Sequence, residues 1–378
     1  MLSEEIYTKI ALYCGEANAW QTFMHAGLMP TTGPLIDAFG YRKILMHGQV
    51  QSGKTAAIME VLKKPVYATY RKVLVIQNSL LVLEQYSTRM MDMGLDFQII
   101  DSKTKVINSN IVIVMRNKYR ISAYLSICGN APFIGLVDEC DQTHLPQFMH
   151  SALVQFNITA TPYKRYYKNY FQKVIQIPIP ADYYGFNRLN IHQLDYIRDK
   201  NVFDKFVRAA NIFIEDTKDT EGMLLLNHVI SVDSMHMLSA YLSAIFTEIP
   251  IIVLSSKKTV TINGVISKTK RGAISKTIDS LNAYPRIIFI ANILSLRGLS
   301  YTSSDFKRHL THQYSRLCSN DYTSIIQRMR IFGRYSDNTS IHLIVDELDI
   351  DYIPKLMRKN NKTIMATDMI DCPLLSFI

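Results

Sequence analysis

The sequence predicts an α/β fold of two tandem domains, each with a parallel sheet flanked by helices. Short apolar runs of strand length alternate with segments of helical periodicity, which is typical of parallel sheets with crossover helices. The alternation occurs twice, on either side of a segment rich in Pro and Tyr at residues 176–190. A length of 378 residues suits two domains of about 150 residues each.

The first half alternates strands and helices from residue 44 onward. Each strand is a short apolar run, such as KVLVIQ or FIGLV, which indicates a sheet buried on both faces. The predicted strands are 44–46, 72–77, 111–115, 133–137 and 156–159, and the predicted helices are 56–62 and 80–93.

The second half repeats this pattern after an aperiodic stretch that we interpret as a linker. Its predicted strands are 223–227, 251–254, 286–291 and 341–345, and its predicted helices are 202–214 and 234–246. The predicted division is a first domain at 1–177 with an N-terminal helical segment, a linker at 178–200, a second domain at 201–345 and a C-terminal tail at 346–378.

Composition narrows the class of protein. Apolar residues make up 48% and charged residues 20% of the chain, which excludes a mainly disordered protein. The 42 Lys and Arg exceed the 32 Asp and Glu by 10, so a polyanion, nucleic acid above all, is the leading partner class; a mere solubility role is the alternative. Five scattered cysteines without CxxC or ligand-spaced histidines argue against disulfides or a structural zinc site.

The termini and apolar stretches bear on location. The N-terminus lacks a signal pattern, and the longest apolar stretches have only strand length, so we expect no membrane span. We therefore expect an intracellular protein, cytoplasmic or at a viral replication site, and not a secreted one.

Residues 48–55 read GQVQSGKT, which fits G-x-x-x-x-G-K-[ST] between a predicted strand and helix. Gly48 and Gly53 let the backbone curl so that N–H groups point at phosphate oxygens, and the helix N-terminus adds its positive end. Lys54 brings a charge to the β- and γ-phosphates, and the Thr55 hydroxyl can bind Mg²⁺. The pattern predicts a nucleotide site formed by Gly48, Gln49, Val50, Gln51, Ser52, Gly53, Lys54 and Thr55.

Two further motifs end buried strands. LVDECD places Asp138 where it can hold Mg²⁺ and its water shell, and Glu139 where it can orient or deprotonate the attacking water. TATP at 159–162 follows another strand and by itself is an ordinary strand end.

The order GQVQSGKT, DECD, TATP resembles motifs I, II and III of superfamily 2 helicases and translocases, and the DNA-type members most. VLVIQNSLLVLEQY at 73–86 is similar to motif Ia, and the VQSGKT loop is similar to that of compact bacterial and phage ATPases. The sequence is rich in Ile, Lys, Asn and Tyr, which suggests an AT-rich genome and so agrees with a viral or phage member. The resemblance implies two RecA-like domains, ATP and Mg²⁺ as cofactors, and coupling roles for Asp141, Thr159 and Thr161.

In the second half, 222–242 looks like motif IV and 291–301 like motif V, with Arg297 and Gly298 in the RG position. The resemblance implies that Arg297, Gly298 and Gln327 contact a nucleotide held between the two domains. A glutamine motif for adenine has only Gln21 as a candidate, which an ordinary amphipathic helix also explains.

QRMRIFGRY at 327–335 resembles motif VI, usually Q-R-x-G-R-x-x-R. Ile331 falls where the family has its middle arginine, and Arg330 stands one place early. We favour a shifted backbone, because compact relatives have a Q-x-x-R-x-F-G pattern that fits here. The resemblance then makes Arg330 and Arg334 the arginines that stabilise charge on the transferred γ-phosphoryl.

Two basic segments are candidate nucleic-acid contacts. Residues 163–173 interleave four cations with five aromatics, and 257–276 carry six cations in an extended loop or a β-hairpin around Asn263-Gly264. A solvated helix and a plain surface hairpin are the alternatives. The candidate contacts are Lys164, Arg165, Lys168, Lys257, Lys258, Lys270 and Arg271.

The leading hypothesis is a monomeric ATP-driven helicase or translocase on nucleic acid, DNA more than RNA. One alternative is a terminase-like packaging motor, which needs nuclease carboxylates spread through its second half. The second half instead carries RG at 297–298 and QRMRIFGR at 327–334, and the acids of the tail lie in one short segment, 346–351. The other alternative is a non-catalytic, nucleotide-regulated nucleic-acid-binding protein, which the intact Lys54, Asp138 and Glu139 disfavour.

Overall fold

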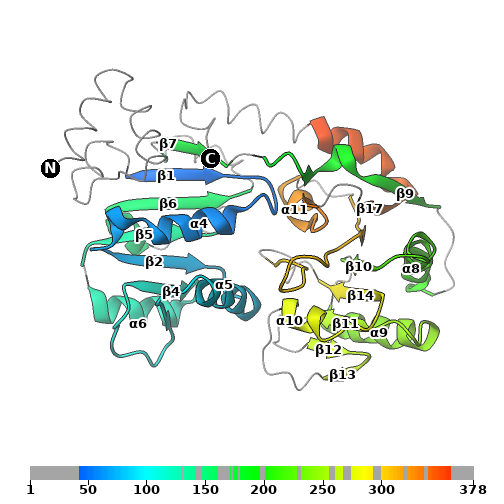
Figure 1. The fold of residues 1–378 in the computed structure, drawn as a ribbon, viewed down its shortest axis with the longest axis horizontal. Coiled ribbons are helices and arrows are strands. Elements are labelled where there is room, and N and C mark those ends of the chain that lie inside the picture. Colours follow the sequence, from blue (N-terminus) through cyan, green and yellow to red (C-terminus); the bar gives the residue numbers. More distant parts are fainter. Residues whose placement is uncertain are drawn as a thin grey trace. The chain divides into compact units, whose positions relative to one another are not determined.

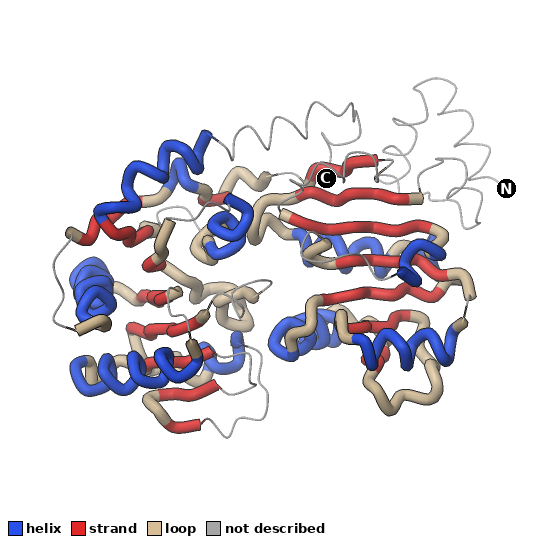
Figure 2. Tube along the Cα trace, turned by 180° about the vertical axis from the view of Figure 1, so that it is seen from behind, coloured by secondary structure: helices blue, strands red, loops and turns tan. Residues whose placement is uncertain are grey.

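The structure is a computed structural model that divides into two compact units. Among the described residues, the first unit takes 42–78 and 87–179, and the second takes 79–86 and 180–358. Each unit is built around one main sheet with helices alongside (Figure 1), and Figure 2 shows the same strands from behind. The structure describes residues 42–129, 131–140, 147–160, 171, 173–177, 179–195, 201–227, 231–254, 260–266, 274–292, 299–317, 322–335 and 339–358.

The described strands of the first unit form a parallel sheet in the order β3-β4-β2-β5-β6-β1-β7. Its helices are α4 (Lys54–Lys63), α6 (Lys118–Cys128) and the part of α5 (Leu80–Asp92) from Ser87 onward, with 3-10 helices η1 (Pro65–Tyr67) and η2 (Gln147–Ser151). The strands are β1 (Lys43–His47), β2 (Arg71–Ile76), β3 (Gln98–Ile100), β4 (Ile111–Met115), β5 (Phe133–Val137), β6 (Val154–Thr159) and β7 (Lys173–Gln176).

The predicted strands and helices of this unit are confirmed, with shifts of at most two residues at their ends. The central strands β4, β5 and β6 are buried along their whole length, as their continuous apolar runs predict. Two short strands, β3 and β7, and helix α6 were not predicted. Helix α6 packs on β3 and β4.

The described part of the second unit has a sheet in the order β13-β12-β11-β14-β10-β15-β17-β9. The run from β11 to β9 is parallel, while β12 and β13 are antiparallel additions. The strands are β9 (Asn190–Leu194), β10 (Gly222–Leu226), β11 (Ile251–Leu254), β12 (Val260–Ile262), β13 (Val265–Ile266), β14 (Arg286–Ala291), β15 (His312–Tyr314) and β17 (His342–Asp346).

The helices of this unit pack on the sheet around one apolar core. α8 lies on β9 and β10, and α9 lies on β11 and β14. A separate antiparallel pair joins β8 (Tyr183–Tyr184) to β16 (Gly333–Arg334). The helices are α8 (Asp204–Asp216), α9 (Val232–Ile245), α10 (Ile274–Asp279) and α11 (Tyr322–Arg328), with 3-10 helices η3 (Phe186–Arg188) and η4 (Glu347–Tyr352).

The hairpin predicted at Asn263-Gly264 is confirmed. Both residues have positive φ, 48° and 79°, as a two-residue hairpin turn of the primed type requires. The Asn263 side chain accepts a hydrogen bond of 2.7 Å from the Ile251 N–H, which ties the turn to β11.

The segment predicted as linker, 178–200, is more structured than expected. It holds β8, η3 and β9, and β9 adds a parallel strand beside β17, so the second unit begins near Pro180. The prediction missed β9 because NIHQL is a mostly polar, half-exposed edge strand without an apolar run.

The predicted tail begins inside β17, and its acidic residues have structural partners. Asp346 accepts a hydrogen bond of 2.7 Å from the Tyr314 hydroxyl and pairs with the Arg316 guanidinium at 3.1 Å. Asp349, with no exposed surface, accepts from Arg316 Nε at 2.7 Å and from the Leu317 N–H at 2.9 Å. These two carboxylates hold the end of the sheet together, which removes them as nuclease candidates.

No helix in the described ranges is both long and apolar enough to cross a membrane.

Candidate nucleotide-binding site

Three sequence motifs meet at one edge of the first sheet. Strands β5, β6 and β1 are neighbours and parallel, so their carboxyl ends lie together. The loop 48–53 follows β1, the Asp138-Glu139 pair follows β5, and TATP follows β6. Ligands of parallel α/β sheets bind at this carboxyl edge, so the arrangement is that of a site.

The loop after β1 needs both of its glycines, for different reasons. Gly53, which starts α4, has φ 103°, a left-handed conformation that side chains disfavour. Gly48 is crowded: a Cβ there would lie 2.8 Å from Ser52 Oγ and 3.0 Å from Ile177 Cβ. Gln51 also has positive φ, 57°, so the loop turns sharply before the helix begins.

Lys54 lies against this loop. Its Nζ donates to the carbonyl oxygen of Gln49 at 2.8 Å and to that of Gly48 at 3.4 Å. Thr55 follows in the first turn of α4, whose N–H groups form the positive end of the helix dipole. The loop therefore gathers a cation, a hydroxyl and a helix N-terminus, the groups that bind phosphate and its metal.

The acidic pair lies in a tight turn after β5. Asp138 is 7% exposed and Glu139 is 6% exposed. The Glu139 N–H donates to Asp138 Oδ1 at 3.0 Å, and Glu139 has a φ of 48°, which is uncommon for a residue other than glycine. The backbone therefore holds the two carboxylates in one defined turn.

Arg116, directly after β4, supports this turn from the side. Its guanidinium donates to the carbonyl oxygen of Asp138 and, at 2.9 Å, to that of Glu139. The sequence analysis did not single out Arg116, because a lone arginine after a strand carries no local signal. Only the neighbourhood of β4, β2 and β5 brings it to the acidic turn.

The end of β6 is hydrogen-bonded to both other motifs. The Gly48 N–H donates to the Thr159 carbonyl oxygen at 3.2 Å, and the Cys140 N–H donates to that of Ile158 at 3.0 Å. His47 Nε2 lies 3.3 Å from the Ala160 carbonyl oxygen. The loop after β1 and the turn after β5 are therefore both hydrogen-bonded to the end of β6, where Thr159 lies.

In the second unit, Arg330 is a buried residue, 5% exposed. Its backbone N–H donates to Gln313 Oε1 at 2.8 Å, and its guanidinium donates to the carbonyl oxygen of Gln327, which is itself buried. Its charge also acts on Tyr183 and Tyr301, whose pKa values burial raises and the guanidinium lowers. Arg330 is thus part of the packing of its own unit.

Arg334 is in a different environment. Its side chain is 61% exposed, and Nε donates to both carboxylate oxygens of Asp182 at 3.0 Å. This hydrogen bond lowers the pKa of Asp182 and raises that of Arg334. Of the two arginines predicted to act on phosphate, the structure exposes Arg334 and buries Arg330.

The remaining predicted site residues lie outside the described residues: Gln21, Asp141, Thr161, Lys164, Arg165, Lys168, Lys257, Lys258, Lys270, Arg271, Arg297 and Gly298.

No protein-family model matches the chain, and no curated protein matches it either. Solved structures do match. Saccharomyces cerevisiae Dbp5 bound to RNA and ADP BeF3 is 15% identical with a TM-score of 0.54, over 88% of this chain and 89% of that one. The DEAD-box helicase Mss116 bound to ssRNA and UDP-BeF is 13% identical with a TM-score of 0.57, over 88% and 72%.

A DNA-bound helicase matches as well. RecG bound to a three-way DNA junction is 11% identical with a TM-score of 0.52, over 100% of this chain and 54% of that one. At sequence identities this low, the matches establish the fold and nothing further. The chain therefore shares the fold of these structures, two tandem RecA-like domains with parallel sheets flanked by helices.

Proposed function

We propose that the chain is an ATP-dependent helicase or translocase that acts on nucleic acid, on DNA in preference to RNA. The observation that carries the proposal is the hydrogen-bonded edge of the first sheet, where the phosphate loop, the acidic turn and the end of β6 are tied together. A nucleotide bound there would act on all three motifs at once.

Each residue of the edge has a role in the proposed hydrolysis. The backbone of 48–53, Lys54 and the start of α4 bind the phosphates. Thr55 and Asp138 would hold Mg²⁺, which fits because a hydroxyl and a carboxylate are the oxygen donors that Mg²⁺ prefers. When bound, Mg²⁺ neutralises charge on the β- and γ-phosphates. Glu139 orients or deprotonates the attacking water.

Arg334 is the arginine that we propose to stabilise the γ-phosphoryl during hydrolysis. Its exposure supports this role, because the side chain can exchange Asp182 for a phosphate oxygen without leaving a buried carboxylate unpaired. Arg330 would have to break buried hydrogen bonds to do the same. We therefore propose that Arg330 supports the motif and that Arg334 acts on phosphate.

Nucleic acid is the proposed partner, held mainly through its phosphates, as suits a motor that must tolerate every sequence. The chain's charge of +10 supports this partner class. The preference for DNA rests on the TATP motif, which resembles that of the DNA-type members. The matching structures do not distinguish the two nucleic acids, because Dbp5 and Mss116 were solved with RNA and RecG with DNA.

The test is Mg²⁺-dependent ATP hydrolysis measured in parallel with single-stranded DNA, duplex DNA, branched DNA and RNA, followed by strand displacement on the best activator. We expect DNA to stimulate more than RNA. Stimulation by RNA alone would overturn the DNA preference and leave the motor intact. Hydrolysis that no nucleic acid changes would contradict the motor, and ATP binding without hydrolysis would favour the non-catalytic regulatory protein.

Charge substitutions separate the two candidate basic segments. One variant replaces Lys164, Arg165 and Lys168 by Ala, and the other replaces Lys257, Lys258, Lys270 and Arg271. Each cation that binds a phosphate and is replaced should reduce the slope of log affinity against log salt concentration by about 0.7–0.9. If neither variant changes this slope, the basic surplus serves solubility alone.

A further inference from the structure

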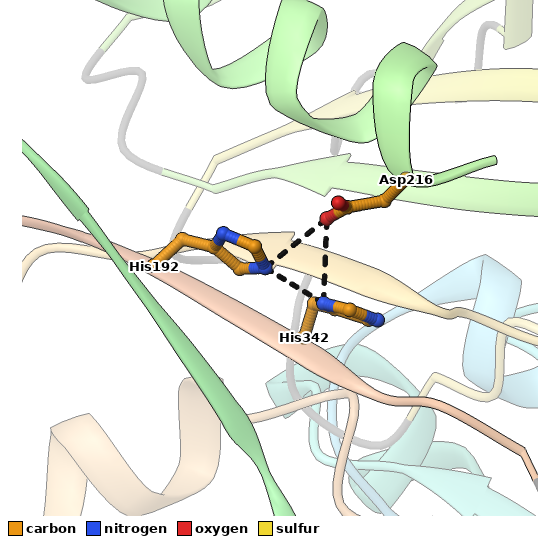
Figure 3. A group of neighbouring side chains, drawn as sticks. All are labelled: His192, Asp216 and His342. Atoms are coloured by element: carbon orange, nitrogen blue, oxygen red, sulfur yellow. Dashed lines mark hydrogen bonds and ion pairs between the residues drawn. The ribbon is translucent and has the colours of Figure 1, made fainter. Parts of the chain in front are cut away.

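Three histidines and one aspartate gather in the second unit. They are His192 of β9, His312 of β15, His342 of β17 and Asp216, the last residue of α8. Figure 3 shows His192, Asp216 and His342 pointing toward one another. We call these four residues the histidine cluster.

The strand register explains how distant residues meet. His312 and His342 are direct partners on neighbouring parallel strands, so their rings lie on one face and stack at 4.3 Å between centroids. Asn190 is the partner of His342 on β9, and His192, two residues on, returns to that same face. The end of α8 brings Asp216 onto this face.

The ligand atoms have the spacing of a coordination shell. Asp216 Oδ2 lies 3.1 Å from His192 Nε2 and 3.3 Å from His342 Nδ1, and those two nitrogens are 2.7 Å apart. Zinc bound tetrahedrally at about 2.0–2.1 Å separates its ligand atoms by about 3.3 Å. Small outward rotations of the two rings would therefore admit a metal ion between the three atoms.

The position that His312 occupies completes the arrangement. Its Nε2 lies 3.1 Å from Asp216 Oδ2, and its Nδ1 lies 2.9 Å from Thr311 Oγ1. A carboxylate oxygen accepts, so the ring presents its Nε2–H to Asp216 and fixes the direction in which Asp216 points. Outer hydrogen bonds of this kind orient metal ligands in proteins.

We propose that His192 Nε2, Asp216 Oδ2 and His342 Nδ1 form a site for a divalent transition metal of the zinc class, with His312 as the residue that positions Asp216. Two imidazoles and a carboxylate are ligands that Zn²⁺ accepts readily. The side chains of His192 and Asp216 are 28% and 25% exposed, so a metal ion can enter and a water can fill the fourth position.

The consequence of binding is structural. The three ligands come from β9, α8 and β17, so the metal would clip the polar edge strand β9 to the sheet and to the helix that covers it. Sequence spacing cannot reveal the site, because 24 residues separate His192 from Asp216 and 126 separate Asp216 from His342 (216 − 192 and 342 − 216). The lack of closely spaced ligands in the sequence excludes only local zinc motifs and does not exclude a site built from distant residues.

Zinc binding to the full chain, freed of metal by a chelator and dialysis, tests the proposal. We expect isothermal titration with ZnCl₂ to give one site per chain with a micromolar or tighter Kd. Asp216→Asn, which keeps the shape and one acceptor oxygen, and His192→Ala should each weaken binding by at least tenfold. The matched control is His236→Ala, on α9 and outside the cluster, which should bind as the unchanged chain does.

Two further readouts keep the outcome decisive. Saturating Zn²⁺ should raise the Tm of the unchanged chain and of His236→Ala but not that of Asp216→Asn, and bound Co²⁺ should show the visible absorption of a low-symmetry, four-coordinate site. Circular dichroism identifies a variant that fails to fold, and the other ligand variant then decides. Less than a tenth of an equivalent bound, or equal binding by Asp216→Asn and His192→Ala, would show that the cluster is only a hydrogen-bond network.

Discussion

Replacing Arg116 by Ala should impair ATP hydrolysis, although Arg116 lies in none of the nucleotide-binding motifs. The guanidinium donates to the carbonyl oxygens of Asp138 and Glu139 and so holds the acidic turn in place. Alanine leaves both carbonyl groups without this donor, in a turn where Glu139 already has a positive φ. The two carboxylates should then sample positions from which they cannot serve magnesium and water.

The size of the effect follows from the two bonds. A hydrogen bond from a charged donor contributes about 1.5–3 kcal/mol, so the low end for two bonds is about 3 kcal/mol. A change of about 1.36 kcal/mol in the activation free energy changes the rate tenfold. If the whole loss of hydrogen-bond energy misplaced the two carboxylates, kcat would therefore fall about 100-fold. Because part of the loss should appear in the free energy of unfolding instead, we expect kcat to fall between about 10-fold and 100-fold.

The assay is steady-state ATP hydrolysis with saturating nucleic acid, alongside thermal unfolding. Arg120→Ala is the matched control, since Arg120 is a partly buried arginine of the same unit that donates to the Ile100 carbonyl oxygen away from the acidic turn. The kcat of Arg116→Lys should lie between those of the unchanged chain and Arg116→Ala, because a single ammonium group replaces the forked guanidinium group. An Arg116→Ala enzyme with unchanged kcat, or one that loses no more than Arg120→Ala does, would refute the reasoning.

Three other predictions concern single residues. Gly48→Ala should lower the free energy of unfolding by about 1–3 kcal/mol and weaken ATP binding, measured by titration, because its Cβ would crowd Ser52 and Ile177; an unchanged variant would mean that the loop can widen. Arg334→Ala should lower kcat by two or more orders of magnitude at unchanged Tm, whereas Arg330→Ala should lower both; normal hydrolysis by both variants would make the motif VI assignment wrong. Burial lowers the pKa of His309, so the unfolded chain takes up the proton first and stability falls as pH drops below about 6.5. His309→Gln should reduce that dependence in denaturant titrations at pH 5 and 7, and an identical pH dependence would contradict the cause.

The parts of the fold that were predictable are those with a strong local signal. Continuous apolar runs predicted the buried strands, and the Asn263-Gly264 pair predicted a hairpin that both residues' positive φ confirms. The phosphate loop was recognisable because its chemistry is compressed into eight consecutive residues, 48–55.

What escaped prediction depends on pairing between distant elements. β15 has only three residues and pairs with β10 and β17, while β9 is polar and pairs with β17, so each strand depends on its neighbours in the sheet. The acids at Asp346 and Asp349 could be separated from a nuclease site only by finding Arg316 beside them.

The candidate site residues that escaped prediction are also brought together by elements distant in the sequence. Arg116 reaches the acidic turn through the order of three strands, and the histidine cluster is assembled by a helix and three strands. Neither arrangement leaves a local spacing in the sequence. Conversely, the resemblance to motif VI could not distinguish a buried Arg330 from an exposed Arg334, because exposure is a property of the folded unit.

The most direct test of the central claim is Mg²⁺-dependent ATP hydrolysis by the unchanged chain and by Lys54→Ala, each with and without nucleic acid. Lys54 lies against the phosphate loop, so its loss removes the cation proposed to bind the β- and γ-phosphates. We expect hydrolysis that nucleic acid stimulates in the unchanged chain and that falls by at least about 100-fold in the variant. Equal, nucleic-acid-stimulated hydrolysis by both proteins, or none by either, would contradict it.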